Sequence, residues 1–341
     1  MEIDREKLSG CLWGCAVGDS LGLPFENLSS RRIAKLLKKR KLDHRFVLKR
    51  GMVSDDTDHS LIVARSILRH PQDSLSFQKL MASDLKRWVL AVPPGIGLGT
   101  LRSLLKLVVG VSPPKSGVYS AGNGPAMRSA VIGCLLSDNR SLRIEYTEKS
   151  SQITHSDPKA TIGALAISEI AACLANGQWK DKPSLSELEN TLSAISSDQE
   201  WAQIVAKISD TLMSGQTLAE MVSSQGAKRG VSGYVYHTVP FAIVCWYRHF
   251  GDFEATVEHC IRAGGDTDTT AAICGALAGI TASLDSIPER WREGILLWPF
   301  RKEQLDGFEI STPPVWQMAL RNLFSLSVIL VHCGRRCLPP Y

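Results

Sequence analysis

The sequence predicts an all-α fold in which many helices surround one core. Apolar residues recur at helical spacing along most of the chain, whereas the alternation that is typical of β-strands is almost absent. Signals for helix ends frame the apolar stretches. Pro158 precedes and Gly177 follows one strongly periodic stretch, for example, and Pro24 ends the first apolar stretch. Such a pattern is typical of a domain built from packed helices.

The length and the composition are those of an ordinary globular protein. The chain has 341 residues, of which 44% are hydrophobic and 21% are charged. No linker, low-complexity tract or repeat of fixed period divides it. We therefore expect residues 1–341 to form a single domain. A monomer is the simplest assumption about the oligomeric state.

No segment has the pattern of a signal peptide or of a membrane span. The charged start, Met1–Lys7, is not followed closely by an apolar leader region. The longest apolar runs, near Leu8–Val17 and Leu323–Val331, have about half of the roughly 20 residues that a membrane helix needs. We expect both runs to be buried helices and expect no association with a membrane.

The nine cysteines are scattered along the chain, and none of them forms a CxxC pair. Most lie in apolar helical contexts, which favours buried free thiols in a reducing compartment. We therefore expect a cytoplasmic protein. Cys333 and Cys337 are the two cysteines near enough in the tail to suggest a pair.

The first predicted helix, Glu6 to Gly22, carries a stripe of glycines. Gly10, Gly14, Gly18 and Gly22 recur at every fourth residue and therefore line one face. Each glycine costs about 1 kcal/mol relative to alanine inside a helix. Four on one stripe indicate the close approach of another helix or of a ligand. Asp19 near the end of this helix is expected to be a structural carboxylate.

Further helices are expected along the chain, and the last of them should close the core. Their ranges are Phe77–Val92, Leu101–Val109, Lys159–Asn176, Ser184–Ile195, Glu200–Leu212, Tyr234–Phe250 and Trp316–Val331.

Two acidic clusters stand where helices are expected to begin. The first is Ser54-Asp55-Asp56-Thr57-Asp58, and the second is Asp266-Thr267-Asp268-Thr269-Thr270, which follows two glycines. One carboxylate at a helix N-terminus is ordinary capping, but two carboxylates with several hydroxyls exceed what a cap needs. Gathered oxygen ligands are what Mg²⁺, Mn²⁺ or Ca²⁺ require. Two such clusters suggest the two halves of a shared metal centre.

Two glycine-rich loops also precede predicted helices. They are Pro93–Thr100 and Tyr119–Arg128. Backbone N–H groups at such places can hold a phosphate, although a plain helix entry has the same pattern. His155, which precedes the helix at Lys159–Asn176, is by itself more typical of a structural histidine.

The net charge of +5 is concentrated in one segment. Ten Lys and Arg residues and one acidic residue, Asp43, fall between Arg31 and Arg50, so the rest of the chain has a net charge of −4. Such a segment can meet phosphates or nucleic acid. The simpler interpretation is the solvated face of a helix that turns Ile33, Leu36 and Leu37 inward.

Five motifs together resemble those of the ADP-ribosylglycohydrolase family, in the family's order and over nearly the whole chain. They are Gly18-Asp19-Ser20-Leu21-Gly22 with Glu26, Ser54-Asp55-Asp56-Thr57, Gly122-Asn123-Gly124-Pro125-Ala126-Met127-Arg128, Thr154-His155, and Gly264-Gly265-Asp266-Thr267-Asp268-Thr269. Ser54 stands where many members have threonine, which keeps the hydroxyl. The resemblance implies a compact, orthogonal multi-helix bundle with two metal ions, usually Mg²⁺, for which Mn²⁺ can substitute.

The resemblance also implies roles for individual residues. The metal ligands would be Ser54, Asp55, Asp56, Asp266, Asp268 and Thr269. The residues that hold ADP-ribose would be Ser120, Gly122, Asn123, Gly124 and His155, with Gly97 and Gly99 near the diphosphate. Either Glu26 or Asp56 would serve as the general base or help the leaving group depart.

The function expected from the resemblance is a Mg²⁺-dependent hydrolase that releases ADP-ribose from a modified acceptor, with a protein arginine as the default. ADP-ribosylated nucleic acid, bound with the help of Arg31–Arg50, and small ADP-ribose esters are alternatives. An ADP-ribose-binding module without turnover and a structural protein are disfavoured by the complete set of carboxylates. A two-metal phosphoester hydrolase has the same types of ligand, so only a substrate test separates it.

Overall fold

The computed structural model describes residues 4–38, 40–226, 229–308 and 311–336. Within these residues the chain is almost entirely helical, which confirms the all-α fold. The α-helices are α1 (Arg5–Gly22), α2 (Ser30–Leu37), α3 (Asp55–Arg69), α4 (Ser74–Leu90), α5 (Leu98–Val108), α6 (Gly124–Met127), α7 (Ala130–Leu135), α8 (Arg140–Thr154), α9 (Pro158–Ala175), α10 (Leu185–Ser193), α11 (Gln199–Met213), α12 (Leu218–Ser224), α13 (Val235–Arg248), α14 (Phe253–Arg262), α15 (Thr267–Ala282), α16 (Glu289–Glu293), α17 (Lys302–Leu305) and α18 (Val315–Arg336). The short strands are β1 (Leu28–Ser29), β2 (Gly51–Met52), β3 (Gly264–Gly265) and β4 (Ile295–Leu296).

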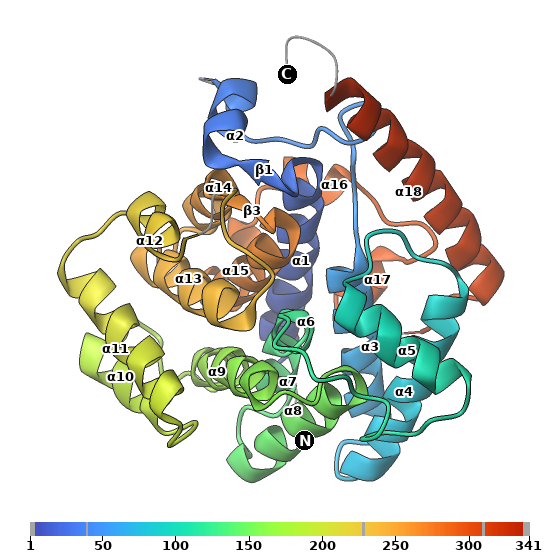
Figure 1. Cartoon of the computed structure of the whole chain (residues 1–341), viewed down its shortest axis with the longest axis horizontal. Helices are drawn as coiled ribbons and strands as arrows, with labels where there is room; N and C mark the ends of the chain where they lie inside the picture. Colours follow the sequence, from blue (N-terminus) through green and yellow to red (C-terminus); the bar gives the residue numbers. More distant parts are fainter. Residues whose placement is uncertain (1–3, 39, 227–228, 309–310, 337–341) are drawn as a thin grey trace.

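Helices α1 and α15 form the centre of the bundle, with the other helices around them (Figure 1). The glycine stripe of α1 lies directly against the backbone of α15. A Cβ atom built on Gly14 would stand 2.1 Å from the carbonyl oxygen of Gly275, and one on Gly18 would stand 2.0 Å from that of Ala271. No side chain fits in so small a space. The stripe therefore marks a helix–helix contact, one of the two alternatives that the sequence indicated.

This contact brings the end of α1 to the start of α15. Thr267 at the start of α15 donates a hydrogen bond from its hydroxyl to the carbonyl oxygen of Gly22, the last residue of α1, over 2.9 Å. Just beyond, β1 pairs antiparallel with β3, and Leu28 lies opposite Gly265. The loop that carries Glu26 is thereby fixed beside the second acidic helix start.

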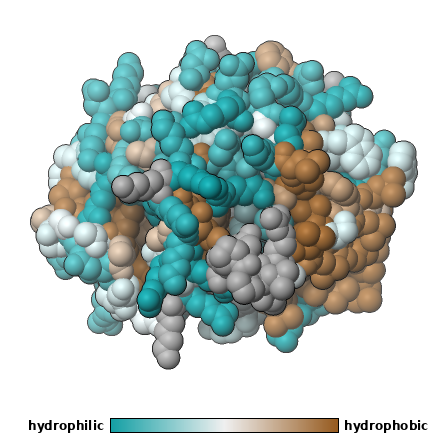
Figure 2. Space-filling model, turned by 90° about the horizontal axis from the view of Figure 1, so that it is seen from above, coloured by the Kyte–Doolittle hydropathy of each residue, from teal (hydrophilic) through white to brown (hydrophobic). Residues whose placement is uncertain are grey.

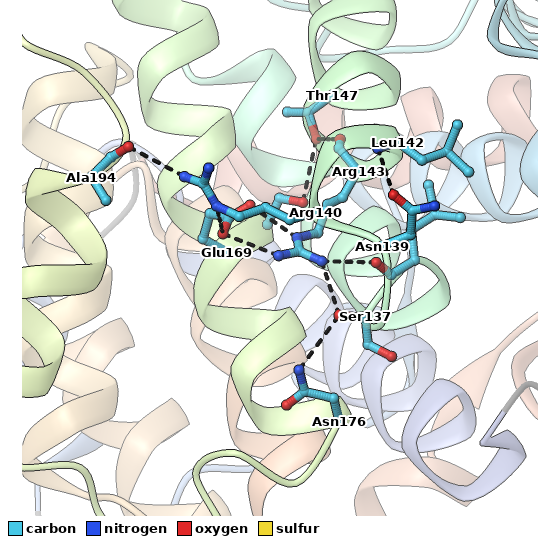
Figure 3. A network of polar contacts seen from close by, with 11 residues as sticks. Ser137, Asn139, Arg140, Leu142, Arg143, Thr147, Glu169, Asn176 and Ala194 are labelled. Atoms are coloured by element: carbon cyan, nitrogen blue, oxygen red, sulfur yellow. Dashed lines mark hydrogen bonds and ion pairs between the residues drawn. The ribbon is translucent and has the colours of Figure 1, made fainter.

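A buried ion pair joins α8 to α9 on the other side of the bundle. Arg143 of α8 donates to both carboxylate oxygens of Glu169 of α9, over 2.9 and 3.1 Å, as Figure 3 shows. Its Nη1 donates to the carbonyl oxygens of Leu136 and Ser137. Charged groups buried in this way need such full pairing. The pair holds the two helices between which His155 stands.

Two smaller expectations hold within the described residues. Cys11, Cys15, Cys134, Cys173, Cys245, Cys260 and Cys274 are buried free thiols, as predicted, and Cys333 is an exposed free thiol. The proposed pairing of Cys333 with Cys337 involves a residue outside the described part. Helix α2 buries Ile33 and Leu37 and turns basic residues such as Lys35 to solvent, which agrees with the simpler interpretation of the basic segment; Lys39 lies outside the described residues.

The prediction that the last helix closes the core, with Leu323–Val331 buried, is wrong. Helix α18 lies along the outside of the molecule, and its large apolar residues form an exposed area at the right of Figure 2, on the side where α18 lies in Figure 1. Leu323, Leu330 and Val331 are each more than 60% exposed. Its inward side instead carries Arg321, Asn322 and Ser325. Helical periodicity marks an apolar face but cannot say which face other elements cover.

Among the described residues, two helices are long and apolar enough to cross a membrane by length and composition alone. One is Pro158–Ala175, of which 72% is buried, as in the core helix of a soluble protein. The other is Val315–Gly334, of which 22% is buried. The expected absence of a membrane association stays a prediction.

Candidate active site and metal centre

The start of α3 is held by Asp19 of α1. Asp19 Oδ2 accepts hydrogen bonds from the backbone N–H groups of Ser54 and Thr57, over 2.8 and 3.3 Å, and from the Thr57 hydroxyl over 2.5 Å. Asp19 is thus the structural carboxylate that the sequence suggested. Because Asp19 satisfies donors of this helix start, the side chain of Asp55 is not required for capping.

The start of α15 is held by an amide from the second glycine-rich loop. Asn123 Nδ2 donates to Asp266 Oδ2 over 2.7 Å and to Thr238 Oγ1 over 3.0 Å. Directly before Asp266, Gly265 has a φ of 90°. A Cβ there would lie 2.0 Å from the carbonyl oxygen of Val231. Glycine is therefore required for the turn that presents Asp266.

The two acidic helix starts meet at Asp56. Its Oδ2 accepts hydrogen bonds from the Ser54 hydroxyl over 3.2 Å and from the Thr269 hydroxyl over 3.4 Å. Segments more than 200 residues apart in the chain therefore present their oxygen atoms to one another. Asp56 is fully buried, Asp268 is 6% exposed, and Asp55 is half-buried.

Burial and mutual repulsion raise the pKa values of these carboxyl groups. Burial, with the negative charges of Asp19 and Asp58, raises the pKa of Asp55 to about 8. Burial, with Asp55, Asp19 and Asp266 nearby, raises the pKa of Asp56 well above its ordinary value. Burial, with the negative charge of Glu26 as the next largest cause, does the same for Asp268. Carboxylates gathered in this way favour a compensating cation.

The unsatisfied oxygen atoms of the cluster suit a divalent cation. Asp19 Oδ1, Asp56 Oδ1 and Asp268 Oδ1 are buried and have no hydrogen-bond partner among the described residues. A buried oxygen atom without a partner destabilises the fold unless a bound ligand contacts it. Oxygen atoms of this kind are the preferred ligands of Mg²⁺. Within the described residues, no group of three or more His, Cys, Asp and Glu side chains is already arranged to hold a metal ion. The metal centre stays a prediction that the donor chemistry fits.

A cleft of about 360 Å³ opens beside this cluster. Every residue assigned to ADP-ribose lines it, namely Gly97, Gly99, Ser120, Gly122, Asn123, Gly124 and His155. The cleft also contains Glu26, Asp55, Asp266, Asp268 and Thr269. Ser54 and Asp56 do not line it.

Glycine is what keeps the cleft open around His155. A Cβ on Gly122 would lie 2.9 Å from His155 Nε2, and one on Gly99 would lie 3.0 Å from the Ser120 hydroxyl oxygen. A side chain at either position would fill the space. The backbone of these loops can therefore come close to a bound phosphate or sugar.

The matches to known proteins agree with this geometry. The family model described as ADP-ribosylglycohydrolase matches residues 1–315. The chain belongs to the ADP-ribosylglycohydrolase family. The match ends where α18 begins, so almost all of this helix lies beyond it.

The relatives of this family member include both archaeal and animal proteins. An uncharacterized protein from Archaeoglobus fulgidus is 34% identical over 85% of this chain and 92% of its own. ADP-ribosylhydrolase ARH3 of Gallus gallus is 26% identical over 84% of this chain and 88% of its own length. ADP-ribosyl-[dinitrogen reductase] glycohydrolase of Rhodospirillum rubrum is 24% identical over 84% of this chain and 89% of its own length.

A solved structure has the same fold. The chain of an "ADP-ribosylglycohydrolase-related protein complex" superimposes with a TM-score of 0.65, covering 94% of this chain and 100% of that one at 21% identity. This agreement confirms the ADP-ribosylglycohydrolase type of bundle.

In this glycohydrolase-family chain, a buried arginine sets the orientation of His155. Arg128 donates to the Thr154 hydroxyl oxygen over 2.8 Å, and that oxygen lies 2.9 Å from His155 Nδ1. The direction of the hydrogen bond between Thr154 and Nδ1 depends on the ring tautomer, and in either tautomer the bond holds the ring with Nε2 toward the cleft. Burial and the charge of Arg128 lower the pKa of His155 to about 3, so the ring stays neutral.

Several residues of the site were not predicted from the sequence. Arg128 stood in a family motif but received no role, although it is fully buried beneath His155. Asp58 stood in the first acidic cluster, yet its carboxylate points away to Trp88 and Arg321. The cleft is also lined by Gly95, Leu98 and Thr100, which lie within a glycine-rich loop that the sequence analysis had identified. Gly233 lines it as well, and no sequence pattern indicated this residue.

Proposed function

We propose that this chain is a hydrolase that cleaves the glycosidic bond between ADP-ribose and a modified acceptor and releases ADP-ribose. The observation that carries the proposal is the cleft, because it joins a glycine-lined space around His155 to the carboxylates of two helix starts. Relatives whose names give ADP-ribosylhydrolase and ADP-ribosyl glycohydrolase activities support the same class of reaction.

Two Mg²⁺ ions, with Mn²⁺ as a substitute, would be held by Ser54, Asp55, Asp56, Asp266, Asp268 and Thr269. When bound, such ions lower the pKa of water and hold ribose hydroxyls. The buried, partnerless oxygen atoms of Asp56 and Asp268 support this ligand set.

Glu26 is better suited than Asp56 to serve as the general base. It is half-buried and lines the cleft, so its carboxylate can reach a water molecule or a leaving group there. Asp56 is fully buried and its Oδ2 is occupied by two hydroxyl donors. Asp56 is therefore better placed to hold an ion and to order its neighbours.

The remainder of the cleft positions the substrate. His155 presents the Nε2 atom of a neutral ring to the cleft, and the backbone of the Gly97–Gly99 loop can approach the diphosphate. Binding of these distant groups fixes the ribose, and that binding energy can serve the chemical step. A protein arginine as the default acceptor, a cytoplasmic location, a single domain and a monomeric state are parts of the proposal that follow from the sequence alone.

The decisive experiment measures free ADP-ribose released from arginine-, serine- and nucleic-acid-linked substrates, each with Mg²⁺ and with a chelator. Asp55→Ala and Asp266→Ala are measured alongside. Metal-dependent release that both variants lose would establish the hydrolase and its linkage. Binding of ADP-ribose without release from any substrate would favour a binding module, and the absence of both would refute the proposal.

A further inference from the structure

The outer side of α18 is apolar along its whole length and carries no charge. Every exposed residue between 315 and 334 is uncharged. The exposed apolar side chains include Trp316, Leu320, Leu323, Phe324, Leu330 and Val331, each of them 48–64% exposed. Figure 2 shows this apolar area at its right. Large exposed apolar areas mark sites of contact with a protein or a membrane.

Buried polar contacts on the inner side of α18 keep this apolar side facing outward. Arg321 donates to Asp58 Oδ1 over 2.8 Å and to Oδ2 over 2.5 Å, and Asn322 donates to the carbonyl oxygen of Ala91 over 2.8 Å. Because bidentate pairs of this kind fix orientation, α18 is held in one position against α3. Crossing a bilayer would separate Arg321 from Asp58 and leave both charges unpaired. The helix therefore lies on the domain, although its length and composition alone would allow it to span a membrane.

The basic segment Arg31–Arg50 lies beside the C-terminal end of α18. His332 Nε2 is 2.9 Å from the carbonyl oxygen of Phe46, and the two rings stack with their centroids 5.0 Å apart. Val328 and Ile329, one turn earlier, pack against the small core cluster that contains Phe46. Figure 1 shows α2 of the basic segment and this end of α18 at the same end of the molecule. The apolar side and the basic segment therefore adjoin.

A tight turn within the basic segment presents a leucine and two cations to solvent. Two backbone hydrogen bonds between Val47 and Arg50, over 3.0 and 2.6 Å, close the turn. Leu48 at its tip is 95% exposed, and Lys49 and Arg50 are exposed beside it. A leucine placed in this way can enter the acyl boundary of a bilayer while the neighbouring cations meet the headgroups.

Several cations of the basic segment are available to an external anion. Arg31, Lys35, Lys41, Lys49 and Arg50 are exposed, and none of them forms an ion pair with a described residue. A surface with unpaired cations attracts negatively charged partners.

We propose that the outer side of α18 and the adjoining basic segment form a docking surface for a membrane that contains anionic phospholipids. The helix lies in the plane of the interface, where its apolar side chains enter the boundary between headgroups and acyl chains. The cations of the basic segment bind the phosphate groups beside it. The expectation of no membrane association rested on the burial of Leu323–Val331, and the structure instead exposes most of that run.

The composition of the surface favours a bilayer over a second copy of the chain. A second copy would offer the same uncharged helix side, which has no carboxylate for the cations of the basic segment. A nucleic acid would meet the cations but would leave the apolar side chains exposed. An anionic bilayer satisfies both parts at once, because it presents an acyl boundary and negative headgroups side by side.

The docking surface is separate from the proposed active site. Among the described residues, none of α18 and none of the basic segment lines the main cleft. The inference therefore goes beyond the proposed hydrolase and does not depend on it.

The test is sedimentation with lipid vesicles, of phosphatidylcholine alone and of phosphatidylcholine with about 30% phosphatidylserine. One variant combines Leu323→Glu with Leu330→Glu and places two charges on the outer side of α18. The matched control is Met213→Glu, because Met213 is 65% exposed on α11, on the opposite side of the molecule (Figure 1). Both positions are exposed, so the variants should fold, and thermal unfolding verifies that they do.

A second variant removes charge from the basic segment by combining Lys35→Gln, Lys49→Gln and Arg50→Gln. Its binding to both kinds of vesicle is measured at about 50 and about 300 mM salt, because salt screens the attraction between exposed charges. Sedimentation velocity without vesicles gives the oligomeric state of each protein over a range of concentrations.

We expect the wild type to bind the phosphatidylserine vesicles at least about tenfold more tightly than the neutral ones, and to lose affinity as the salt rises. The Leu323→Glu and Leu330→Glu variant and the charge-removed variant should each bind at least about tenfold more weakly, whereas Met213→Glu should match the wild type. Failure of the wild type to bind either vesicle would overturn the proposal. Equal binding by the wild type and the Leu323→Glu and Leu330→Glu variant would overturn the role of α18.

A second copy of the chain as the occupant gives a different result. The wild type would then form a dimer without vesicles, the Leu323→Glu and Leu330→Glu variant would remain a monomer, and neither would bind lipid. That outcome would also overturn the proposal. No measurement in this test uses a substrate, so failure of the proposed hydrolase would leave the result unaffected.

Discussion

Asn123 Nδ2 lies 2.7 Å from Asp266 Oδ2 and joins the glycine-rich loop of the cleft to the second acidic helix start. The same amide donates to Thr238 Oγ1, so its orientation is fixed from both sides. A residue that lines the cleft thereby also orients a carboxylate assigned to the metal centre. Loss of this amide should therefore disturb both functions.

Asn123→Ala is expected to weaken Mg²⁺ binding about 10–100-fold, the range that is typical of lost partners of metal ligands. The affinity for ADP-ribose should fall as well, because Asn123 lines the cleft. Isothermal titration with each ligand measures both effects. Asn190→Ala, an exposed position on α10, is the control. Unchanged Mg²⁺ affinity in Asn123→Ala would show that Asp266 needs no such orientation or is no ligand.

Asp268→Asn should remove most of the stabilisation by Mg²⁺. Without metal at pH 8, removing this buried charge should raise the Tm, because neighbouring carboxylates repel it. With Mg²⁺ at about 100 times its Kd, the free energy of unfolding of the wild type should rise by about 2.7 kcal/mol, whereas that of the variant should rise little. Thermal unfolding with Mg²⁺ and with a chelator measures both. A variant that Mg²⁺ stabilises as strongly as it does the wild type would remove Asp268 from the ligand set.

Gly18→Ala should destabilise the fold although alanine favours helices. The added Cβ would stand 2.0 Å from the carbonyl oxygen of Ala271, so α1 and α15 would have to separate. Overpacking of this kind costs about 1–3 kcal/mol, more than the roughly 1 kcal/mol that alanine gains in helix propensity. Urea unfolding measures the difference. Gly334→Ala in α18, where a Cβ meets nothing within 4 Å, should show no such loss. Equal stability of the two variants would contradict the close contact.

His155 should make the protein less stable in mild acid. Its pKa is lowered from 6.5 to about 3 in the folded state, chiefly by burial. Below pH 6.5 the unfolded chain therefore takes up a proton that the folded chain does not, and stability is lost as the pH falls toward 3. At pH 5 this loss amounts to about 2 kcal/mol.

His155→Asn removes that titration, so the free energy of unfolding of the variant should fall by about 2 kcal/mol less than that of the wild type between pH 7.5 and pH 5. His59, whose pKa is also lowered by burial, remains in both proteins and cancels in the comparison. Urea unfolding at the two pH values measures the difference. Parallel pH profiles would mean that the His155 ring is not held neutral.

The basic segment Arg31–Arg50 should not be needed for a peptide substrate. Replacing Lys38, Lys39, Arg40 and Lys41 with glutamine should leave the turnover of ADP-ribosylated peptide, and its dependence on salt, within about twofold of the wild type, since charges on a solvated surface are screened. Steady-state rates from 50 to 300 mM salt measure this. A strong loss confined to nucleic-acid-linked substrate would instead assign the segment to phosphate binding.

The sequence alone determined most of the long helices, the two acidic helix starts and the glycine stripe of α1, although α8 and α14 were not predicted. These features depend on residues only a few positions apart, because capping, helical periodicity and glycine content act locally. The predicted helix ends therefore lie within a few residues of those observed, as for α9, which was expected at Lys159–Asn176 and spans Pro158–Ala175.

Tertiary structure alone decided which of these parts meet. The glycine stripe showed that something comes close, but only the fold identifies α15 as that partner. No local pattern indicated that Arg321 of an apolar tail helix pairs with Asp58, 263 residues earlier, or that the polar side of α18 faces inward. The choice of helix face depends on the packing of distant segments. The buried polar side of α18 could therefore be found only in the folded chain.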